Sequence, residues 1–560
     1  MSDILLSRHL VQTPVYPTQN LYEYLVSNQG LCNPSDVAQY RVDGKAVTRE
    51  EIYHMSSKVS AFLKKTLGLQ HGDRVAIISP NSTLYTPIVL GILRAGMVCV
   101  PLNPIYSLDE FVHPFQDSDI AAFFVFPGVI PNVRPAMEKA NRSFKTPSGQ
   151  NALWLMDDGD NVKDAATGEK DFRTVLPNDS VPICKIDYPT DRTAFIVYSS
   201  GTSGKPKGVE LTHDNLKSNM EGLPAISKNE ISSEGVLIAV LPMFHIFGLN
   251  ILVLSSYLFG MVMVVVPRFD LEVFCAVVQK YKVTFAPVVP PMILGLARHP
   301  IVDKYDMSSL HTLMSGAAPL GKELGDEFER RLTKSRVTQG YGLSETSPVI
   351  SLTPSDEYND HKGSCGEVFP GLEVRLVDEN GKDVAGIQGE DGVPGELWVR
   401  GRSVMKGYRN NKAATSECIT PDRWFMTGDV AIHKKGHLYI VDRKKELIKY
   451  KGFQVPPAEL ESLLLSHPDV QDVAVMGVQD KEQATELPRA YLVPKPNALD
   501  IKTASQQDKD SFCKKVSDWQ AERVANYKKL RGGIVLISEV PKSAAGKILR
   551  RVLRDEHQPA

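Results

Sequence analysis

Residues 74–101 read RVAIISPNSTLYTPIVLGILRAGMVCVP, and the pattern of this stretch indicates the fold class. It begins with a short apolar run at residues 74–79 and ends with another at residues 98–101, both typical of buried strands. Between them, residues 81–95 place apolar side chains on one face at helical spacing, after a polar cap at residues 80–82. The order strand, helix, strand predicts a parallel sheet covered by helices, with ligands beyond the carboxyl ends of the strands.

Short apolar runs of the same kind recur up to about residue 370, after which short strand candidates separated by turns replace them. The further runs occupy residues 121–126, 194–198, 236–241, 261–266 and 283–289. Later strand candidates at residues 372–377, 395–401 and 437–441 are separated by turns of Gly, Asp and Asn, as in antiparallel hairpins. From residue 456 on, a helix, a pair of strands and a Lys-rich helix indicate a compact α+β unit.

Together these patterns predict an α/β protein of two domains. The large N-terminal domain, residues 1–442, would hold the parallel-type sheets with their helices and the β-rich layer. The small domain, residues 443–560, would hold the final α+β unit. A chain of 560 residues exceeds what one hydrophobic core usually serves, which agrees with this division.

Composition and charge exclude several classes of protein. Hydrophobic residues make up 42% and charged residues 23%, so a mainly disordered or membrane-embedded chain is excluded. The net charge of -2 provides no basic field that would favour nucleic acid as a partner. The 7 cysteines are scattered and lack the spacing of a disulfide framework or a zinc ribbon. The N-terminus lacks the pattern of a secretory signal. We therefore expect a cytoplasmic protein with no membrane span.

The first segment that carries chemistry is YSSGTSGKPKG at residues 198–208, directly after an expected strand. Glycines let backbone N–H groups approach an anion, hydroxyls add donors, and Lys205 and Lys207 supply positive charge, as a polyphosphate requires. The glycine spacing differs from the Walker pattern, which disfavours a P-loop NTPase. Taken alone, the segment could equally be a flexible surface loop.

Two further segments, MSGAAP at residues 314–319 and QGYGLSET at residues 339–346, each join a strand-like run to a turn of small residues. Such turns would let a flat base lie against the backbone, and Glu345 would offer a carboxylate to Mg²⁺. Glu345 also occupies the position of the third glycine in a dinucleotide-binding fingerprint, so a Rossmann dinucleotide-binding fold is disfavoured. The alternative is a tight turn with a solvated acid.

Three later segments are weaker when each is considered alone. WFMTGD at residues 424–429 puts Asp429 after a glycine at an expected turn, where its carboxylate could accept both hydroxyls of a ribose. Residues 441–454 gather basic side chains at the expected domain boundary, either as a solvated face or as a hinge with phosphate contacts. Residues 541–550 present Lys547 on a small-residue turn, where an ordinary surface lysine is the alternative.

Taken in order, these five segments resemble the adenylate-forming acyl-CoA ligases, and most closely their 4-coumarate-CoA ligase branch. The branch is indicated by PMFHIF at residues 242–247, SGAAPLG at residues 315–321 and KYKGFQ at residues 449–454. Such enzymes attack the α-phosphate of ATP with a carboxylate to give acyl-AMP, and the thiol of coenzyme A then displaces AMP. The resemblance implies ATP, Mg²⁺ and coenzyme A, a small carboxylic acid as partner, and a monomer or homodimer.

The resemblance also assigns catalytic and nucleotide contacts to this sequence. Lys547 matches the family's catalytic lysine, which would bridge the carboxylate and the α-phosphate and so neutralise two anions. His245 and Lys449 are further catalytic candidates, and Glu345 would lie near Mg²⁺. The implied ATP and AMP contacts are Ser199, Ser200, Gly201, Thr202, Ser203, Lys207, Gln339, Gly340, Tyr341, Ser344, Asp429, Arg443 and Gln454.

A moving C-terminal domain is a further implication of the resemblance. Lys451 and Gly452 match coenzyme A contacts, whereas Lys547 of the same unit serves the first step. The unit would therefore act as a mobile lid that rotates between the steps, and Lys445 matches the hinge position.

The expected acyl pocket departs from that of the hydroxycinnamate enzymes in this branch. Phe247 and Ile251 stand where those enzymes tend to have Tyr and Ser, and an unpaired phenol in an apolar pocket costs on the order of 1–3 kcal/mol. We therefore predict an apolar aryl, cinnamate-like or medium-chain acid, with Ala317 as further wall. Three alternatives stay open: a stand-alone adenylating enzyme that loads a carrier protein, a luciferase-like oxidation that shares the first step, and a non-catalytic nucleotide-binding relative.

Overall fold

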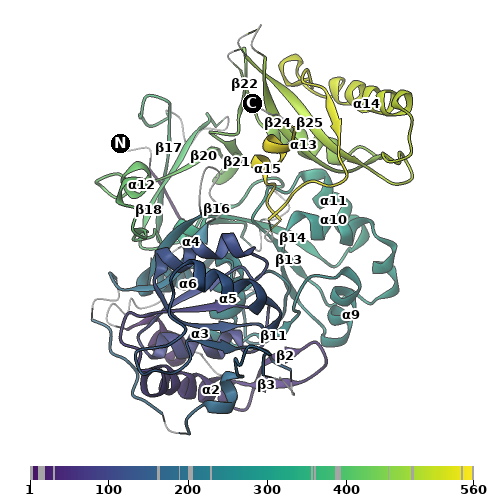
Figure 1. The fold of residues 1–560 in the computed structure, drawn as a ribbon. Coiled ribbons are helices and arrows are strands. Elements are labelled where there is room, and N and C mark those ends of the chain that lie inside the picture. Colours follow the sequence, from purple (N-terminus) through teal and green to yellow (C-terminus); the bar gives the residue numbers. More distant parts are fainter. Residues whose placement is uncertain are drawn as a thin grey trace.

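A computed structural model gives the fold of the chain (Figure 1). It describes residues 4–9, 19–28, 32–159, 164–178, 180–187, 190–199, 206–227, 230–354, 357, 361–384, 392–451, 453–480, 483, 485–543 and 546–557. Within these ranges the strands form sheets of nine, seven, five, three and two strands. Helices cover the two largest sheets, which confirms the α/β prediction.

The strand, helix, strand stretch folds as the sequence predicts, apart from its cap. Strands β4 (Arg74–Ile78) and β5 (Val98–Leu102) are parallel neighbours, joined through α3 (Tyr85–Arg94). The predicted cap is wrong, because the N-cap position is Leu84. Asn81 instead donates its amide to three backbone carbonyls, those of Ala239, Leu241 and Val266. Every residue of α3 is buried, so the helix lies inside the body and not on its surface.

The seven-stranded sheet has the order β19-β9-β8-β5-β4-β6-β7. Its remaining strands are β6 (Ile120–Val125), β7 (Leu153–Leu155), β8 (Thr193–Ser199), β9 (Lys207–Thr212) and β19 (Gly407–Tyr408). Strand β8 runs parallel to β5, and β9 returns antiparallel to β8. The glycine-rich segment therefore connects the carboxyl end of β8 to the start of β9.

The nine-stranded sheet has the order β16-β15-β14-β13-β12-β10-β11-β2-β3. Its parallel strands are β2 (Val37–Arg41), β11 (Val262–Val265), β10 (Val236–Ala239), β12 (Phe285–Val288), β13 (Thr312–Ser315) and β14 (Arg336–Gly342). Antiparallel strands complete its edges: β3 (Ala46–Thr48), β15 (Val349–Leu352) and β16 (Glu367–Val368). The carboxyl ends of β12, β13 and β14 consequently lie at one edge of the sheet.

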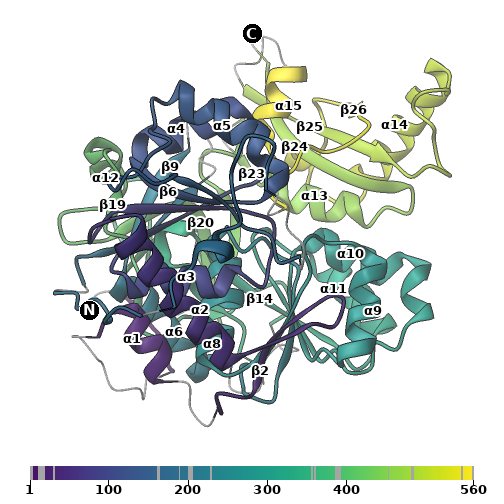
Figure 2. The same cartoon turned by 60° about the horizontal axis from the view of Figure 1, so that its bottom comes forward.

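The helices of this body are α1 (Leu21–Ser27), α2 (Arg49–Ala61), α4 (Leu108–Ser118), α5 (Ile130–Lys139), α6 (His213–Ile226), α7 (Ile246–Gly248), α8 (Ser256–Leu258), α9 (Leu271–Tyr281), α10 (Pro290–Arg298), α11 (Lys322–Arg331) and α12 (Lys412–Cys418). Figure 2 shows α9, α10 and α11 gathered on one side of the body, away from α4 and α5. The π-helix η4 (Leu249–Ser255) is buried, as the apolar stretch predicts. In the described ranges no helix combines the length and apolar character needed to cross a bilayer.

The β-rich layer is an antiparallel sheet of β1 (Leu5–Leu6), β17 (Leu372–Val377), β18 (Gly395–Gly401), β20 (Phe425–Lys434) and β21 (His437–Arg443), in that order. This confirms the predicted hairpins. The turn predicted at Asp429 is wrong, because Asp429 lies inside β20. The preceding Gly428 has a φ of 73°, and the strand pairing shifts register just after it, so the glycine bends the strand without ending it.

The C-terminal unit has its own sheet and core. The sheet consists of β24 (Val470–Asp480), β25 (Thr485–Pro494) and β26 (Ile534–Leu536), with helices α13 (Pro457–Leu465), α14 (Gln506–Ala521) and α15 (Arg550–His557) and a hairpin of β22 (Ile448–Tyr450) and β23 (Phe453–Val455). Two hydrophobic clusters of this unit contain buried residues from Ile448 onward alone. The unit lies above α10 and α11 in Figure 1, where Arg298 donates to the carbonyl of Leu465 at 3.3 Å. The boundary between residues 442 and 443 stays a prediction.

Candidate active site

The glycine-rich segment opens at the carboxyl end of β8. Ser199 ends this strand and pairs in register with Lys207, the first residue of β9. Four predicted contacts, Ser200, Gly201, Thr202 and Ser203, lie outside the described residues. The Lys207 ammonium lies 4.7 Å from the centre of the Tyr408 ring, so the lysine is fixed on an aromatic face at the base of the segment.

Glu345 lies at the hydroxyl of Tyr408, in the short helix η6 (Ser344–Thr346). Its carboxylate accepts a hydrogen bond from the Tyr408 hydroxyl at 2.9 Å, and its carbonyl accepts one from the Met405 amide at 2.8 Å. An ionised carboxylate that binds one hydroxyl keeps lone pairs for a cation, and oxygen ligands suit Mg²⁺. The carboxylate of Glu345 therefore fits a ligand of Mg²⁺.

Asp429 is held by partners on two other strands. The Tyr341 hydroxyl of β14 donates to Asp429 at 2.5 Å, and the Arg443 guanidinium of β21 lies 3.4 Å from its other oxygen. Burial raises the pKa of Asp429, and the positive charge of Arg443 opposes this shift. Asp429 and Arg443 face each other directly across the β20–β21 pair, so the sheet fixes their separation.

Lys547 reaches this group from the C-terminal unit. Its turn is closed by the Ser543 amide, which donates to the Lys547 carbonyl at 2.8 Å. The preceding Gly546 has a φ of 79°, and a Cβ atom there would lie 3.2 Å from Val289 at the end of β12. Glycine is therefore required both by the backbone conformation and by the close approach to the body.

The ammonium of Lys547 lies among charged groups of both parts of the chain. Burial lowers the pKa of Lys547 to about 8, and the positive charge of Arg443 acts in the same direction. Two carboxylates, Glu446 and Asp429, oppose the shift. A lysine with a pKa of about 8 remains mostly positive at neutral pH, so it can neutralise an anion in this site.

His245 is a neutral donor beside this lysine. Its Nδ1 accepts a hydrogen bond from the Phe247 amide at 3.3 Å, which leaves the ring proton on Nε2. Burial lowers the pKa of His245 to about 4, and the charge of Lys547 adds to the shift. His245 and Ser344 line one small hollow together with Tyr198, the residue before Ser199.

Two predicted acyl-pocket residues lie at the end of β13. Ala317 has a φ of 65°, and a Cβ atom at the adjacent Gly316 would lie 3.0 Å from the Phe247 ring. Phe247 therefore packs against the backbone beside Ala317. Ile251, four residues further along the continuous helix of α7 and η4, is buried.

Gln339 and Gly340 lie on β14, and Gln339 lines a separate hollow. The Gln339 side chain accepts a hydrogen bond from the Leu320 amide at 3.2 Å. The hollow beside it is lined by Leu320, Gly321, Gln339, Thr353, His361 and Ser364, among others. A Cβ atom at Gly340 would lie 3.2 Å from Leu352, so the strand pair is closely packed there.

A second set of predicted residues lies apart from Lys547. Lys449, Lys451 and Gln454 are exposed on the β22–β23 hairpin. The backbone amides of Lys449 and Lys451 are bonded to the side chains of Glu486 and Thr485, and Gln454 donates to Glu379 at 3.2 Å. Gly452 lies outside the described residues, and Lys445 is exposed in the turn after β21.

Two residues of the site, Tyr408 and Glu446, were not predicted from the sequence. Tyr408 binds Glu345 and supports Lys207, and the charge of Glu446 acts on Lys547. Tyr408 simply follows a glycine, and Glu446 lies inside a basic run, so neither residue has a local sequence signal of its role. Their partners lie far away along the chain, so only the fold brings them together.

Comparisons with known proteins agree with this arrangement. The family model described as AMP-binding enzyme matches residues 27–409, and that of the AMP-binding enzyme C-terminal domain matches residues 459–547. The chain is 36% identical to 4-coumarate:CoA ligase 1 of Petunia hybrida, over 90% of this chain and 88% of that protein. It is 38% identical to probable 4-coumarate–CoA ligase 2 of Dictyostelium discoideum, over 90% of this chain and 89% of that protein.

Solved structures give the same result for the fold. The crystal structure of ATP-bound MatB from Rhodopseudomonas palustris superposes with a TM-score of 0.80 at 25% identity, covering 96% of this chain and 99% of that one. A crystal structure of the anthranilate CoA ligase AuaEII with anthranoyl-AMP has a TM-score of 0.82 at 22% identity. The chain belongs to the AMP-binding enzyme family, as an ATP-dependent acid–thiol ligase.

Proposed function

We propose that this enzyme activates an apolar carboxylic acid, of the aryl, cinnamate-like or medium-chain kind, as acyl-AMP and transfers the acyl group to coenzyme A. The observation that carries the proposal is the position of Lys547, whose pKa is lowered to about 8 beside Asp429, Arg443 and His245. The names of the Petunia and Dictyostelium relatives, both CoA ligases, support the choice of acceptor.

The first step joins two anions. An oxygen of the substrate carboxylate attacks the α-phosphorus of ATP, a new O–P bond forms, and the bond to the bridging oxygen breaks to release pyrophosphate. Protonated Lys547 would stand between the carboxylate and the α-phosphate, with the Arg443 guanidinium beside it. Preorganised positive charge in a partly buried site lowers the repulsion between these anions without reorganisation of water.

The nucleotide and the carboxylate would be oriented by groups that the body fixes. Asp429 would accept the ribose hydroxyls, since its carboxylate is held in place by Tyr341 and faces Arg443. The Nε2–H of His245 would donate to the substrate carboxylate, because the ring is neutral and its Nδ1 is already bonded. Glu345 would hold Mg²⁺, which when bound spreads the negative charge of the leaving pyrophosphate.

The second step would require another orientation of the C-terminal unit. In the described orientation Lys547 faces the site, while Lys451 lies on the exposed hairpin. Transfer of the acyl group to coenzyme A would follow a rotation of residues 443–560 about Lys445, which is exposed in a turn and therefore free to change its backbone conformation. The rotation would withdraw Lys547 and bring the hairpin to the acyl-AMP.

The acyl pocket is proposed to be apolar. The Phe247 ring packs beside Ala317, and Ile251 is buried four residues later. No hydroxyl from these three side chains can pair a phenol, so a hydroxylated acid would lose about 1–3 kcal/mol of transition-state binding relative to an apolar acid of the same shape.

The test is release of pyrophosphate from MgATP with cinnamate, 4-coumarate and octanoate, each with and without coenzyme A. We expect release that depends on the acid, turnover that requires coenzyme A, and a higher kcat/KM for cinnamate or octanoate than for 4-coumarate. A clear preference for 4-coumarate would overturn the substrate class. Turnover without coenzyme A would contradict coenzyme A as the acceptor. Absence of turnover with all three acids would contradict the proposed substrate class.

A further inference from the structure

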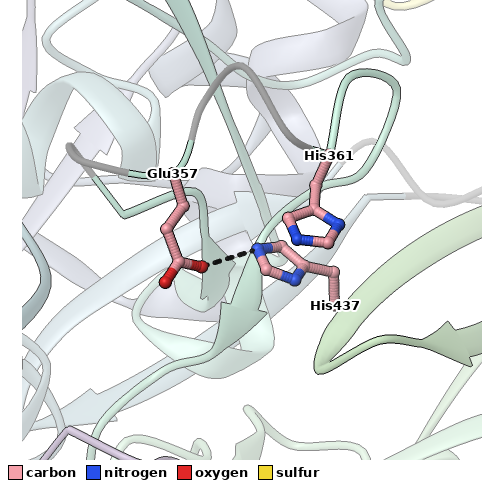
Figure 3. A group of neighbouring side chains, drawn as sticks. All are labelled: Glu357, His361 and His437. Atoms are coloured by element: carbon pink, nitrogen blue, oxygen red, sulfur yellow. Dashed lines mark ion pairs between the residues drawn. The ribbon is translucent and has the colours of Figure 1, made fainter.

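Two histidines and a glutamate gather at the start of the 361–364 loop. Glu357, His361 in the loop and His437 at the start of β21 each offer one ligand atom, and these atoms all lie within 4.8 Å of one another (Figure 3). The three residues take no part in the proposed reaction. Their types, two imidazoles and a carboxylate, are those of a common zinc-binding set.

The protonation of His437 is fixed by its surroundings. Its Nδ1 lies 3.1 Å from the carbonyl of Lys435, which can only accept, so Nδ1 carries the proton and Nε2 carries a lone pair in the neutral ring. The side chain is 1% exposed, and Nε2 has no hydrogen-bond partner among the described residues.

That lone pair points at carboxylate oxygens. Nε2 of His437 lies 3.5 Å from Glu357 Oε2 and 3.8 Å from Glu367 Oε1. Figure 3 shows the Glu357 carboxylate turned toward the ring. These separations are too long for hydrogen bonds, and a lone pair facing a carboxylate is unfavourable without a cation. Two ligands of tetrahedral zinc at about 2.0–2.1 Å from the ion lie roughly 3.4 Å apart, close to the first separation.

His361 supplies the third ligand. Its ring is stacked on His437, with 3.7 Å between the centroids and 17° between the planes. Stacked rings direct their nitrogen lone pairs along parallel lines, so coordination requires the His361 ring to turn out of the stack. The side chain is only partly buried and can turn. Two imidazoles favour zinc over magnesium or calcium, which prefer oxygen alone.

The carboxylates are positioned by the N-terminal segment. Arg8 binds Oε1 of Glu357 and both oxygens of Glu367, and His9 lies 2.9 Å from Glu367. Arg8 thus leaves Oε2 of Glu357 facing His437. The 361–364 loop also lines the hollow beside Gln339, so an ion here would stiffen a wall of that hollow.

We infer that Glu357, His361 and His437 form a zinc site that ties the 361–364 loop to β21. The test uses the full chain freed of metal with a chelator and titrated calorimetrically with ZnCl₂ at pH 7.5. We expect one equivalent to bind and to raise the melting temperature. His361→Ala and Glu357→Gln should each weaken binding at least tenfold, because each removes one of three ligands.

The matched control is His54→Ala on α2, where an exposed histidine also lies beside a glutamate, Glu50, at 3.4 Å. This variant should bind zinc like the parent chain. His361 and Glu357 are partly exposed, so their variants keep the core intact, which circular dichroism verifies. Absence of binding would overturn the inference. Binding unchanged in both ligand variants would overturn it equally, since the ion would then sit elsewhere, for example on one of the 7 free cysteines.

Discussion

Two lysine-bearing segments of the C-terminal unit differ in what surrounds them. The turn with Lys547 packs against Val289 of the body, and burial among charged groups lowers the pKa of that lysine to about 8. The β22–β23 hairpin carries Lys449 and Lys451 exposed to solvent. The structure therefore places Lys547 beside Asp429 and leaves the hairpin lysines in solvent. We infer that the described orientation is the one that serves adenylation.

The largest effect is expected from Lys547→Ala. Removal of one preorganised charge from a transition state typically costs about 10²–10³-fold in rate. Acyl-AMP formation, measured by pyrophosphate release, should fall by that factor, while thioester formation from supplied acyl-AMP should remain. Lys514→Ala, which removes an exposed lysine of α14 paired with Asp518, is the control. Equal loss of both half-reactions in folded protein would contradict the division between the segments.

A smaller effect is expected from Asp429→Asn. The variant keeps the size of the side chain but loses the charge that faces Arg443 and would bind the ribose. Hydrogen bonds to charged groups contribute about 1.5–3 kcal/mol, so the KM for ATP should rise about ten- to hundredfold. The KM for the acid should change little. An unchanged KM for ATP would remove Asp429 from the nucleotide site.

The pH dependence of the two half-reactions should have opposite signs. Lysine is positive below its pKa, so raising the pH through about 8 removes the charge of Lys547 and slows adenylation, approaching tenfold per pH unit. The thioester step should instead accelerate, because the coenzyme A thiol becomes thiolate. Stopped-flow measurement of each half-reaction from pH 6.5 to about pH 9.5 tests this. In Lys547→Arg the alkaline fall should disappear, since guanidinium stays charged.

The smallest effect is expected from Lys451→Ala. An exposed charge pair contributes about 0.2–1 kcal/mol, so the KM for coenzyme A should rise by a factor of about 1.4 to 5. Pyrophosphate release in a single turnover should be unchanged, because this lysine is exposed on the hairpin in the described orientation. A loss of adenylation in this variant would mean that the hairpin also serves the first step.

Local patterns in the sequence predicted the elements well, because strands and helices depend on spacing that the chain itself displays. The β4-α3-β5 stretch is the clearest case. The turn at Asp429 was predicted wrongly, since a glycine with positive φ serves a turn and a strand bend alike. The Tyr408–Glu345 bond could not be predicted, because its partners come from distant segments that only the folded sheets bring together.

A reversible lock of the C-terminal unit would show whether that unit must rotate between adenylation and thioester formation. A Cβ atom at Gly321, the N-cap of α11, would lie 3.2 Å from Cβ of Ser462 on α13. This is slightly less than the roughly 3.5–4.5 Å of a disulfide, so a small shift of the two helices would admit the bond. Gly321→Cys combined with Ser462→Cys should therefore fix the described orientation when oxidised. Each single variant, treated with the same oxidant, controls for the native thiols.

The measurement is single-turnover formation of acyl-AMP and of acyl-CoA in the oxidised and the reduced double variant. We expect the oxidised protein to form acyl-AMP and pyrophosphate at nearly the parent rate but to transfer almost no acyl group, and reduction to restore the transfer. Undiminished thioester formation in the cross-linked protein would contradict the proposed rotation, because both steps would then proceed with the C-terminal unit held in one orientation.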